Sequence, residues 1–511
     1  MKEGPTSVGD KMDGNYRKEL VLITRNAGIT ASGFLFLNTI SFVSNALITR
    51  YLGADDYGLF VLATRVLDFI IVFSSLGFAT TIVRHVAYFH AREDHKRVKG
   101  TVLYSLRVVL VVSIIVLALF FALGPFLFDR IFLRPELGPL FRIVLLSLPL
   151  SLIAMVYLSA LNGLKHIKST VIIRNFINPV VFTVLVGAVI LFDWKLTGLM
   201  WVYVAAGLVT AILAFNSLGK VYMKKLRDTK PEADKKKLWN FSYPMLLIQV
   251  FTNITTLVPI FIIGYYMSSS DVGVFNVSLK ISLIVSFSLN AFAMIFAPVM
   301  SELFSKKDHA MISRLYKTIT KWTFSFSLVI FFIILLFPGT LLGIFGPEFI
   351  SGTGILLFIA GGELVNSGAG LVGSLILMSG RPKIILANNI FKFLLVVILC
   401  LILIPGYGLT GAAFVVAIGQ VAVNIIRLIE LYHLEKMHPF KPSYYKPLLS
   451  GTVSYLIILL ATGWVRMNAY LELMTGTIAF LLLFALLNWI LKLDEEDRFV
   501  IDKLAHYIKR K

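Results

Sequence analysis

The segment YLGADDYGLF at residues 51–60 recurs in weaker form as YMSSSDVGVF at residues 266–275. The two segments align without a gap at an offset of 215 residues, and the same offset pairs Asn38 with Asn253 and Arg65 with Lys280. The tripeptide LTG at 196–198 also recurs, at 409–411. Two similar offsets, one near the start and one near the end of each half, predict an internal duplication.

The repeated segments are embedded in very apolar sequence. Of the 511 residues, 58% are hydrophobic and 15% are charged, with a mean hydropathy of +0.84, whereas soluble domains are about one quarter charged. Apolar runs of about 20 residues, enough to cross a bilayer, follow one another with short polar breaks. The composition therefore predicts an all-α polytopic membrane protein with about fourteen transmembrane helices.

The duplication divides these helices into two six-helix lobes. Because both halves start on the same side, the repeat is parallel, its axis runs along the membrane normal, and a central cavity is expected between the lobes. Two C-terminal helices lie outside the repeat. The expected segments are an N-terminal cytoplasmic arm (1–27), an N-lobe (28–219), a basic cytoplasmic linker (220–240), a C-lobe (241–435), helices 13 and 14 (436–492) and a cytoplasmic tail (493–511), which is either an amphipathic helix or a solubilising extension.

The formal net charge of +20 is explained by topology rather than by nucleic-acid binding. Most Lys and Arg residues fall in alternate connections, and the positive-inside rule assigns these connections and both termini to the cytoplasm. The single cysteine, Cys400, lies in the apolar run FLLVVILCLILIP at 393–405, which excludes an internal disulfide and a cysteine-based metal site. We predict a multi-pass protein of the cell membrane with no nucleic-acid partner.

Two cations are predicted deep inside spans. Arg65 and Lys280 each lie eight residues from the outer end of their helix, or about 12 Å at about 1.5 Å per residue, and charges at such depth are functional candidates. Their equivalence in the repeat predicts two cations that face each other across the cavity and bind a phosphate or another anion. Asp68, three residues after Arg65, offers a purely structural pairing instead. Lys392 is a candidate third cation.

Other polar residues inside the spans have more than one interpretation. Glu363 either pairs with Lys392 or carries a coupling ion. Asn38 and Asn253 belong to polar stripes that either line the cavity or form interhelical hydrogen bonds. The sequence contains no HExxH, Walker A or GxSxG motif, so neither catalytic residues, a metal site nor a cofactor is expected and the chain is interpreted as a transporter, not an enzyme.

Three stretches carry a family resemblance: residues 49–85, which include the repeated segment, NGLKHIKS at 162–169 and SGRPKIILANN at 379–389. They resemble the polysaccharide and O-antigen flippases of the multidrug/oligosaccharidyl-lipid/polysaccharide exporter superfamily. The resemblance implies a V-shaped pair of lobes and transport of a polyprenyl-(pyro)phosphate-linked oligosaccharide to the outer leaflet. It also adds Arg25 to the cavity cations Arg65 and Lys280, and it implies Na+ or H+ coupling. We expect a monomer. Expected partners are this substrate, membrane lipids and polysaccharide-assembly proteins.

Two other functions stay open at this point. A cation-coupled multidrug exporter of the same superfamily would have an acidic cavity and usually twelve spans. A membrane glycan polymerase or ligase would carry a large external loop with catalytic basic residues, and the external connections here are short.

Overall fold

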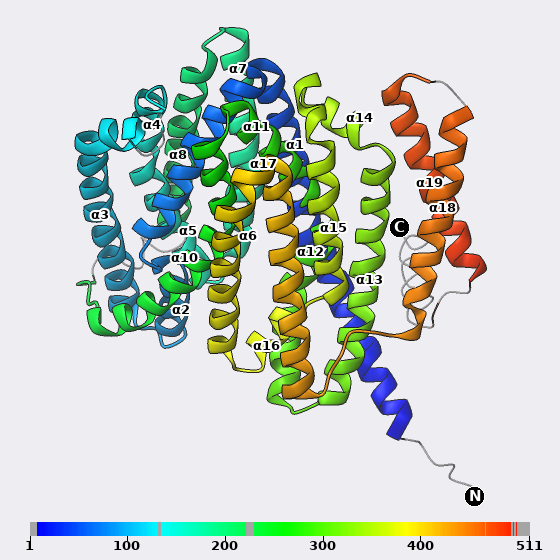
Figure 1. The fold of residues 1–511 in the computed structure, drawn as a ribbon. Coiled ribbons are helices and arrows are strands. Elements are labelled where there is room, and N and C mark those ends of the chain that lie inside the picture. Colours follow the sequence, from blue (N-terminus) through cyan, green and yellow to red (C-terminus); the bar gives the residue numbers. More distant parts are fainter. Residues whose placement is uncertain are drawn as a thin grey trace, which may run out of the picture.

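The chain folds as a bundle of long helices (Figure 1). The structure is a computed structural model and describes residues 8–130, 134–220, 229–464 and 467–491, with Asp494 and Asp497. Side chains are described from residue 33 onward, apart from residues 34, 124–130, 294, 295, 297, 298, 302, 305, 463 and 464. These described parts contain helices and no strand, which confirms the predicted all-α fold class.

The first half of the chain contains α1 (Val8–Ser74), α2 (Phe78–His90), α3 (His95–Arg130), α4 (Leu137–Leu145), α5 (Ser147–Gly163), α6 (Ile167–Val171), the π-helical turn η1 (Ile172–Ile177), α7 (Asn178–Leu191) and α8 (Lys195–Leu218). The second half contains α10 (Lys235–Tyr266), α11 (Ser269–Ser282), α12 (Phe287–Ser305), α13 (His309–Leu336), α14 (Pro338–Gly343), the 3-10 helix η3 (Pro347–Gly352), α15 (Thr353–Ala369), α16 (Val372–Met378) and α17 (Pro382–Glu435). The short η4 (Pro442–Tyr444), α18 (Tyr445–Trp464) and α19 (Ala469–Ile490) follow.

Eleven helices in the described part are long and apolar enough to cross a membrane, or twelve if the bent pair α11 and α12 forms one span. Two of the eleven, α1 and α17, are broken at Gly53 and Gly408, whose φ values of 73° and 57° favour glycine. At α17 the chain folds back on itself (Figure 1). Counting the bent pair as one span and α1 and α17 as two spans each would give fourteen, and that number stays a prediction.

The largest buried cluster combines apolar side chains from both halves, including Phe60 and Phe275 of the two repeated segments. A separate cluster joins α13 to α18 and α19 through Phe332, Ile458 and Phe480. Many large apolar side chains point outward instead, and Ile114, Leu460 and Leu482 are all more than 60% exposed. Lipid is the solvent that such a surface requires, so the chain is a multi-pass membrane protein.

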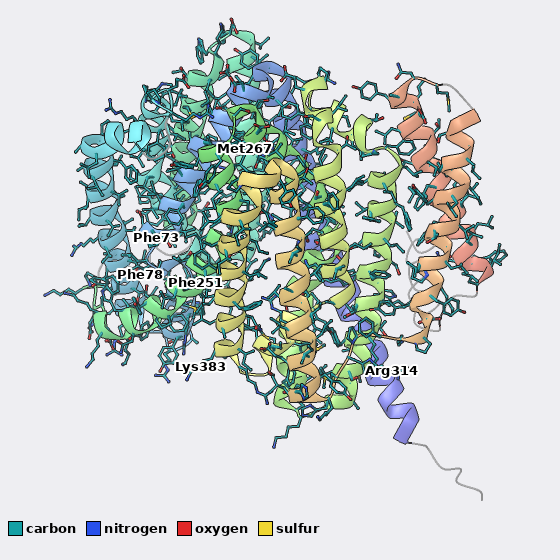
Figure 2. All side chains as sticks on the ribbon, in the orientation of Figure 1. Phe73, Phe78, Phe251, Met267, Arg314 and Lys383 are labelled. Atoms are coloured by element: carbon teal, nitrogen blue, oxygen red, sulfur yellow. The ribbon has the colours of Figure 1, made fainter. Side chains whose placement is uncertain are left out.

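Three labelled residues mark the two ends of the bundle. Figure 2 shows Lys383, at the start of α17, and Arg314, in the first part of α13, at one end, while Met267 between α10 and α11 lies at the other end. We call these the basic end and the opposite end. The arm at 1–27 and the linker at 220–240 lie partly outside the described residues, and most of the tail at 493–511 does too; α1 itself begins at Val8, within the expected arm.

Candidate functional site

Two cavities meet at one face of α1. The first, of about 710 Å³, is mostly apolar and lies between α1, α11, α12 and α13, with Leu35, Phe287 and Ile330 among its lining residues. The second, of about 380 Å³, is more polar and lies between α1, α7, α8 and α11. They share Ser41, Asn45 and Lys280, so the Lys280 side chain stands where the two cavities meet.

Lys280 is held by side chains of the other half of the chain. Its ammonium group donates to the Oδ1 atom of Asn45 in a short hydrogen bond and to the Tyr57 hydroxyl at 3.3 Å. Asn276, one turn earlier on α11, donates to the same hydroxyl at 2.9 Å. Tyr57 and Asn276 are fully buried. Buried polar groups need such partners, so this network fixes the Lys280 ammonium in position.

Arg65 belongs to the same network. Its guanidinium donates to Asp68 at 3.0 Å and to the Oδ1 atom of Asn276 at 3.3 Å, and all three residues line the second cavity. The Arg65 and Asp68 side chains are 29% and 48% exposed. The expected structural pairing of Arg65 with Asp68 is therefore present, and Arg65 also reaches the element that carries Lys280. With two cations and one carboxylate, the network has a net positive charge and suits an anionic ligand.

Of the other predicted residues, the structure places one at the site and others away from it. Asn38 lines the first cavity, whereas Asn253 is exposed on α10 and donates to its own helix at the Gln249 carbonyl, at 2.8 Å. Lys392 of α17 donates to Gln420 at 2.5 Å and lines neither cavity. The side chain of Arg25 lies outside the described residues.

Glu363 forms a second polar cluster, in the C-terminal half. The side chain is 7% exposed and accepts hydrogen bonds from Ser286 and, at 3.2 Å, from Asn366. Asn424 extends the cluster by donating to Asn366 at 3.0 Å. No described basic side chain forms a direct ion pair with Glu363, so of its two interpretations the contact with Lys392 is not formed and the coupling ion stays a prediction. In the described part of the chain, no group of three or more His, Cys, Asp or Glu residues could hold a metal ion.

Sequence reasoning did not single out Tyr57 or Asn276 as part of the site. Tyr57 belongs to the repeated segment at 51–60, so the repeat offered a signal for it. Asn276 follows the second segment directly, but the offset of 215 pairs it with Val61. A buried amide that replaces an apolar residue of the other repeat is the signal that could have identified it.

Comparison with known proteins assigns the family. The family model described as "Polysaccharide biosynthesis protein" matches residues 23–304, which is more than half of the chain. This chain belongs to the polysaccharide biosynthesis protein family. A curated relative, the "Probable low-salt glycan biosynthesis flippase Agl15" of Haloferax volcanii, is 25% identical over 192 residues. That alignment covers 37% of this chain and only 40% of the relative.

Solved structures of the exporter superfamily share the fold of this family member. The lipid II flippase MurJ in an inward closed conformation matches with a TM-score of 0.72 and 15% identity, over 91% of this chain and 98% of MurJ. An inward-facing multidrug resistance MATE transporter matches with a TM-score of 0.68 and 15% identity, over 80% of this chain and 98% of the transporter. At such identity the likeness establishes the fold alone.

Proposed function

We propose that this protein is a flippase that moves a polyprenyl-(pyro)phosphate-linked oligosaccharide from the cytoplasmic to the outer leaflet by alternating access. The observation that carries the proposal is Lys280 at the meeting point of an apolar and a polar cavity, with Arg65 in the same network. The cations suit the phosphate group, the polar cavity suits sugars, and the apolar cavity suits the lipid chain. The product would serve cell-surface polysaccharide or glycoprotein synthesis, and the name of the Haloferax relative supports this role.

A multidrug exporter is the second candidate, because MATE transporters share the fold. Cationic drugs favour an acidic cavity. Among the described residues that line the two cavities, Asp68 is the only acidic one, and it is paired with Arg65. The charge of the site therefore favours the anionic lipid. A polymerase or ligase is the weaker alternative, since the one carboxylate among the described cavity residues, Asp68, is paired with Arg65.

The test is transport by the purified protein in proteoliposomes, with a fluorescent sugar on a polyprenyl pyrophosphate. We expect the Arg65→Ala, Lys280→Ala double variant to lose transport, while Lys236→Ala, a control at an exposed lysine of α10, keeps it. Unchanged transport in the double variant would overturn the assignment of the site. Transport of cationic drugs without transport of the lipid would establish the second candidate instead.

We also propose that the basic end, and with it both termini, faces the cytoplasm. In a Cys400→Ser background, Tyr407→Cys should react with a membrane-impermeant maleimide added outside intact cells, because Tyr407 is 71% exposed and its neighbour Gly408 approaches Met267. Lys383→Cys should react only after permeabilisation. If Lys383→Cys reacts in intact cells and Tyr407→Cys reacts only after permeabilisation, the basic end faces away from the cytoplasm.

A further inference from the structure

The two repeated segments pack against each other at the opposite end of the bundle, where Met267 lies (Figure 2). Gly58 of α1 approaches the backbone of α11 so closely that a Cβ atom would overlap the Ser269 carbonyl oxygen. Gly273 of α11 approaches α1, and a Cβ atom there would lie 2.5 Å from the Ala54 carbonyl oxygen. Ser269 and Gly273 are the counterparts of Ala54 and Gly58 at the offset of 215. The same close contact therefore occurs twice, related by the repeat.

A loop from each half closes over this crossing. Arg134, just before α4, donates to the Met267 carbonyl at 2.7 Å and to the Ser269 hydroxyl at 2.8 Å. Glu348 of η3 accepts a hydrogen bond from the Ala54 backbone N–H at 2.6 Å. Each loop thus binds the repeated segment of the opposite half. We call the two glycine contacts together with these two side-chain contacts the outer seal.

The cation network lies directly beneath the outer seal on the same helices. Tyr57 adjoins Gly58, and Asn276 is three residues beyond Gly273. Within the described part of the chain, Lys280 donates to Asn45 and Tyr57 of the N-terminal half, and Arg65 reaches Asn276 of the C-terminal half. The two cations therefore hold the halves together through neutral oxygen acceptors.

A phosphate oxygen is a stronger acceptor for Lys and Arg than an amide or hydroxyl oxygen. A phosphate group bound to Lys280 and Arg65 would compete with Asn45, Tyr57 and Asn276 for the same N–H groups. Bonds between the halves would then be replaced by bonds to the ligand. A ligand shifts a conformational equilibrium only by its different affinity for the two states, and this exchange supplies such a difference.

We propose that the phosphate group of the substrate releases the Lys280 and Arg65 contacts between the halves and so opens the outer seal. The inference rests on the proposed flippase function and adds the step that links binding to opening. It assigns Tyr57, Asn45 and Asn276 as positioning residues, and Gly58 and Gly273 as the close contact that must separate.

The experiment measures the distance between spin labels at Trp194→Cys and Tyr407→Cys, in full-length Cys400→Ser protein in lipid nanodiscs. Both residues are exposed, at 58% and 71%. Trp194 lies between α7 and α8 in the first half, and Tyr407 lies at the break of α17 in the second half. We expect undecaprenyl pyrophosphate to add a population at longer distance, and undecaprenol, which lacks phosphate, to leave the distance unchanged. Binding of each lipid is followed separately by its effect on thermal unfolding.

Gly58→Ala tests the seal without a ligand, because the added methyl group cannot fit against Ser269. It should produce the longer distance by itself, whereas Gly187→Ala, whose added methyl group would have no atom within 4 Å, should not. Arg134→Ala combined with Glu348→Ala removes both side-chain contacts of the outer seal without adding volume. This double variant should also produce the longer distance, and it replaces Gly58→Ala if that variant fails to fold.

The outcomes separate this inference from the proposed function. If the pyrophosphate binds and is transported but the distance does not change, the link between binding and opening is wrong and the flippase function stands. If the seal variants lengthen the distance but the pyrophosphate does not bind, the proposed function is wrong. If neither Gly58→Ala nor the double variant at Arg134 and Glu348 changes the distance, the contacts of the outer seal do not hold the two halves together.

Discussion

The Nζ atom of Lys280 lies 3.3 Å from the hydroxyl oxygen of Tyr57, although 223 residues separate them in the chain. Tyr57 lies within the first repeated segment, at 51–60, and Lys280 follows the second, at 266–275. The contact places a cation deep in the bundle where an apolar and a polar cavity meet. The charge at this point is therefore the property on which binding of an anionic lipid should depend.

The first prediction concerns that charge. Lys280→Gln keeps a donor for Asn45 but removes the positive charge, and a hydrogen bond to a charged group contributes about 1.5–3 kcal/mol. We expect the apparent affinity for polyprenyl pyrophosphate to fall by about 10- to 150-fold, at 1.4 kcal/mol per factor of ten. Lys280→Arg should retain most of the binding. The measurement is titration of the purified protein with the lipid. Equal affinity in Lys280→Gln and Lys280→Arg would show that binding of the lipid does not depend on the positive charge at this position.

The second prediction concerns the Tyr57 hydroxyl. Tyr57→Phe leaves the buried Asn276 amide without its acceptor at 2.9 Å, and an unsatisfied buried donor costs about 1–3 kcal/mol. We expect a lower midpoint of thermal unfolding and weaker lipid binding, because Lys280 loses a positioning partner.

Tyr243→Phe is the matched control for this variant, since the Tyr243 side chain is 60% exposed. It should leave both measurements unchanged. If Tyr57→Phe has the same midpoint of thermal unfolding as Tyr243→Phe, the hydrogen bonds of the Tyr57 hydroxyl do not stabilise the contact between the halves.

The sequence predicted the helical membrane fold because long apolar runs leave a strong pattern. The offset that pairs Arg65 with Lys280 also indicated two residues that join one network, while anion binding by this pair stays a prediction. The sequence did not predict Asn276, because a neutral amide gains its role from tertiary contacts with residues more than 200 positions away. The repeat was also an incomplete guide. Asn38 lines a cavity, while its counterpart Asn253 bonds to its own helix on an exposed face, because the two helices pack against different neighbours.

The third prediction concerns Glu363 and energy coupling. This buried carboxylate has no ion-pair partner among the described residues, and such a group is costly in a membrane interior, so we expect Glu363 to bind a proton or Na+ during transport. Glu363→Gln keeps the shape and removes the exchangeable charge. In the Glu363→Gln variant, an imposed H+ or Na+ gradient should no longer stimulate transport of the lipid, while transport without a gradient continues.

Asp68→Asn serves as the comparison for Glu363→Gln, because it changes a carboxylate that already has a cationic partner. Its response to the gradient should be retained even if its lipid affinity changes. Full stimulation in Glu363→Gln would exclude Glu363 as the coupling site.

The last prediction concerns ion pairs that join α13 and α18 to Asp494 and Asp497, which follow α19. Lys321, whose side chain is 7% exposed, forms ion pairs of 2.6 Å with Asp494 and Asp497, and Lys446 binds Asp494 at 2.6 Å. Burial raises the pKa of Asp494, but the hydrogen bonds from Lys321 and Lys446 outweigh it and hold this pKa well below its usual range. The two ion pairs of Asp494 thus stabilise the folded state whenever its carboxylate is ionised.

A carboxylate whose pKa is lower in the folded state contributes stability above its unfolded pKa of about 3.9, and this stability is lost as the pH falls through the folded value. We therefore expect Asp494→Asn to lower the midpoint of thermal unfolding at pH 7, and the difference from the unmodified protein to shrink as the pH falls below about 4. Asp55→Asn, at an exposed carboxylate, should show little difference at either pH. A deficit in Asp494→Asn that stays constant down to pH 3 would mean that packing, and not the ion pairs, holds Asp494 against α13.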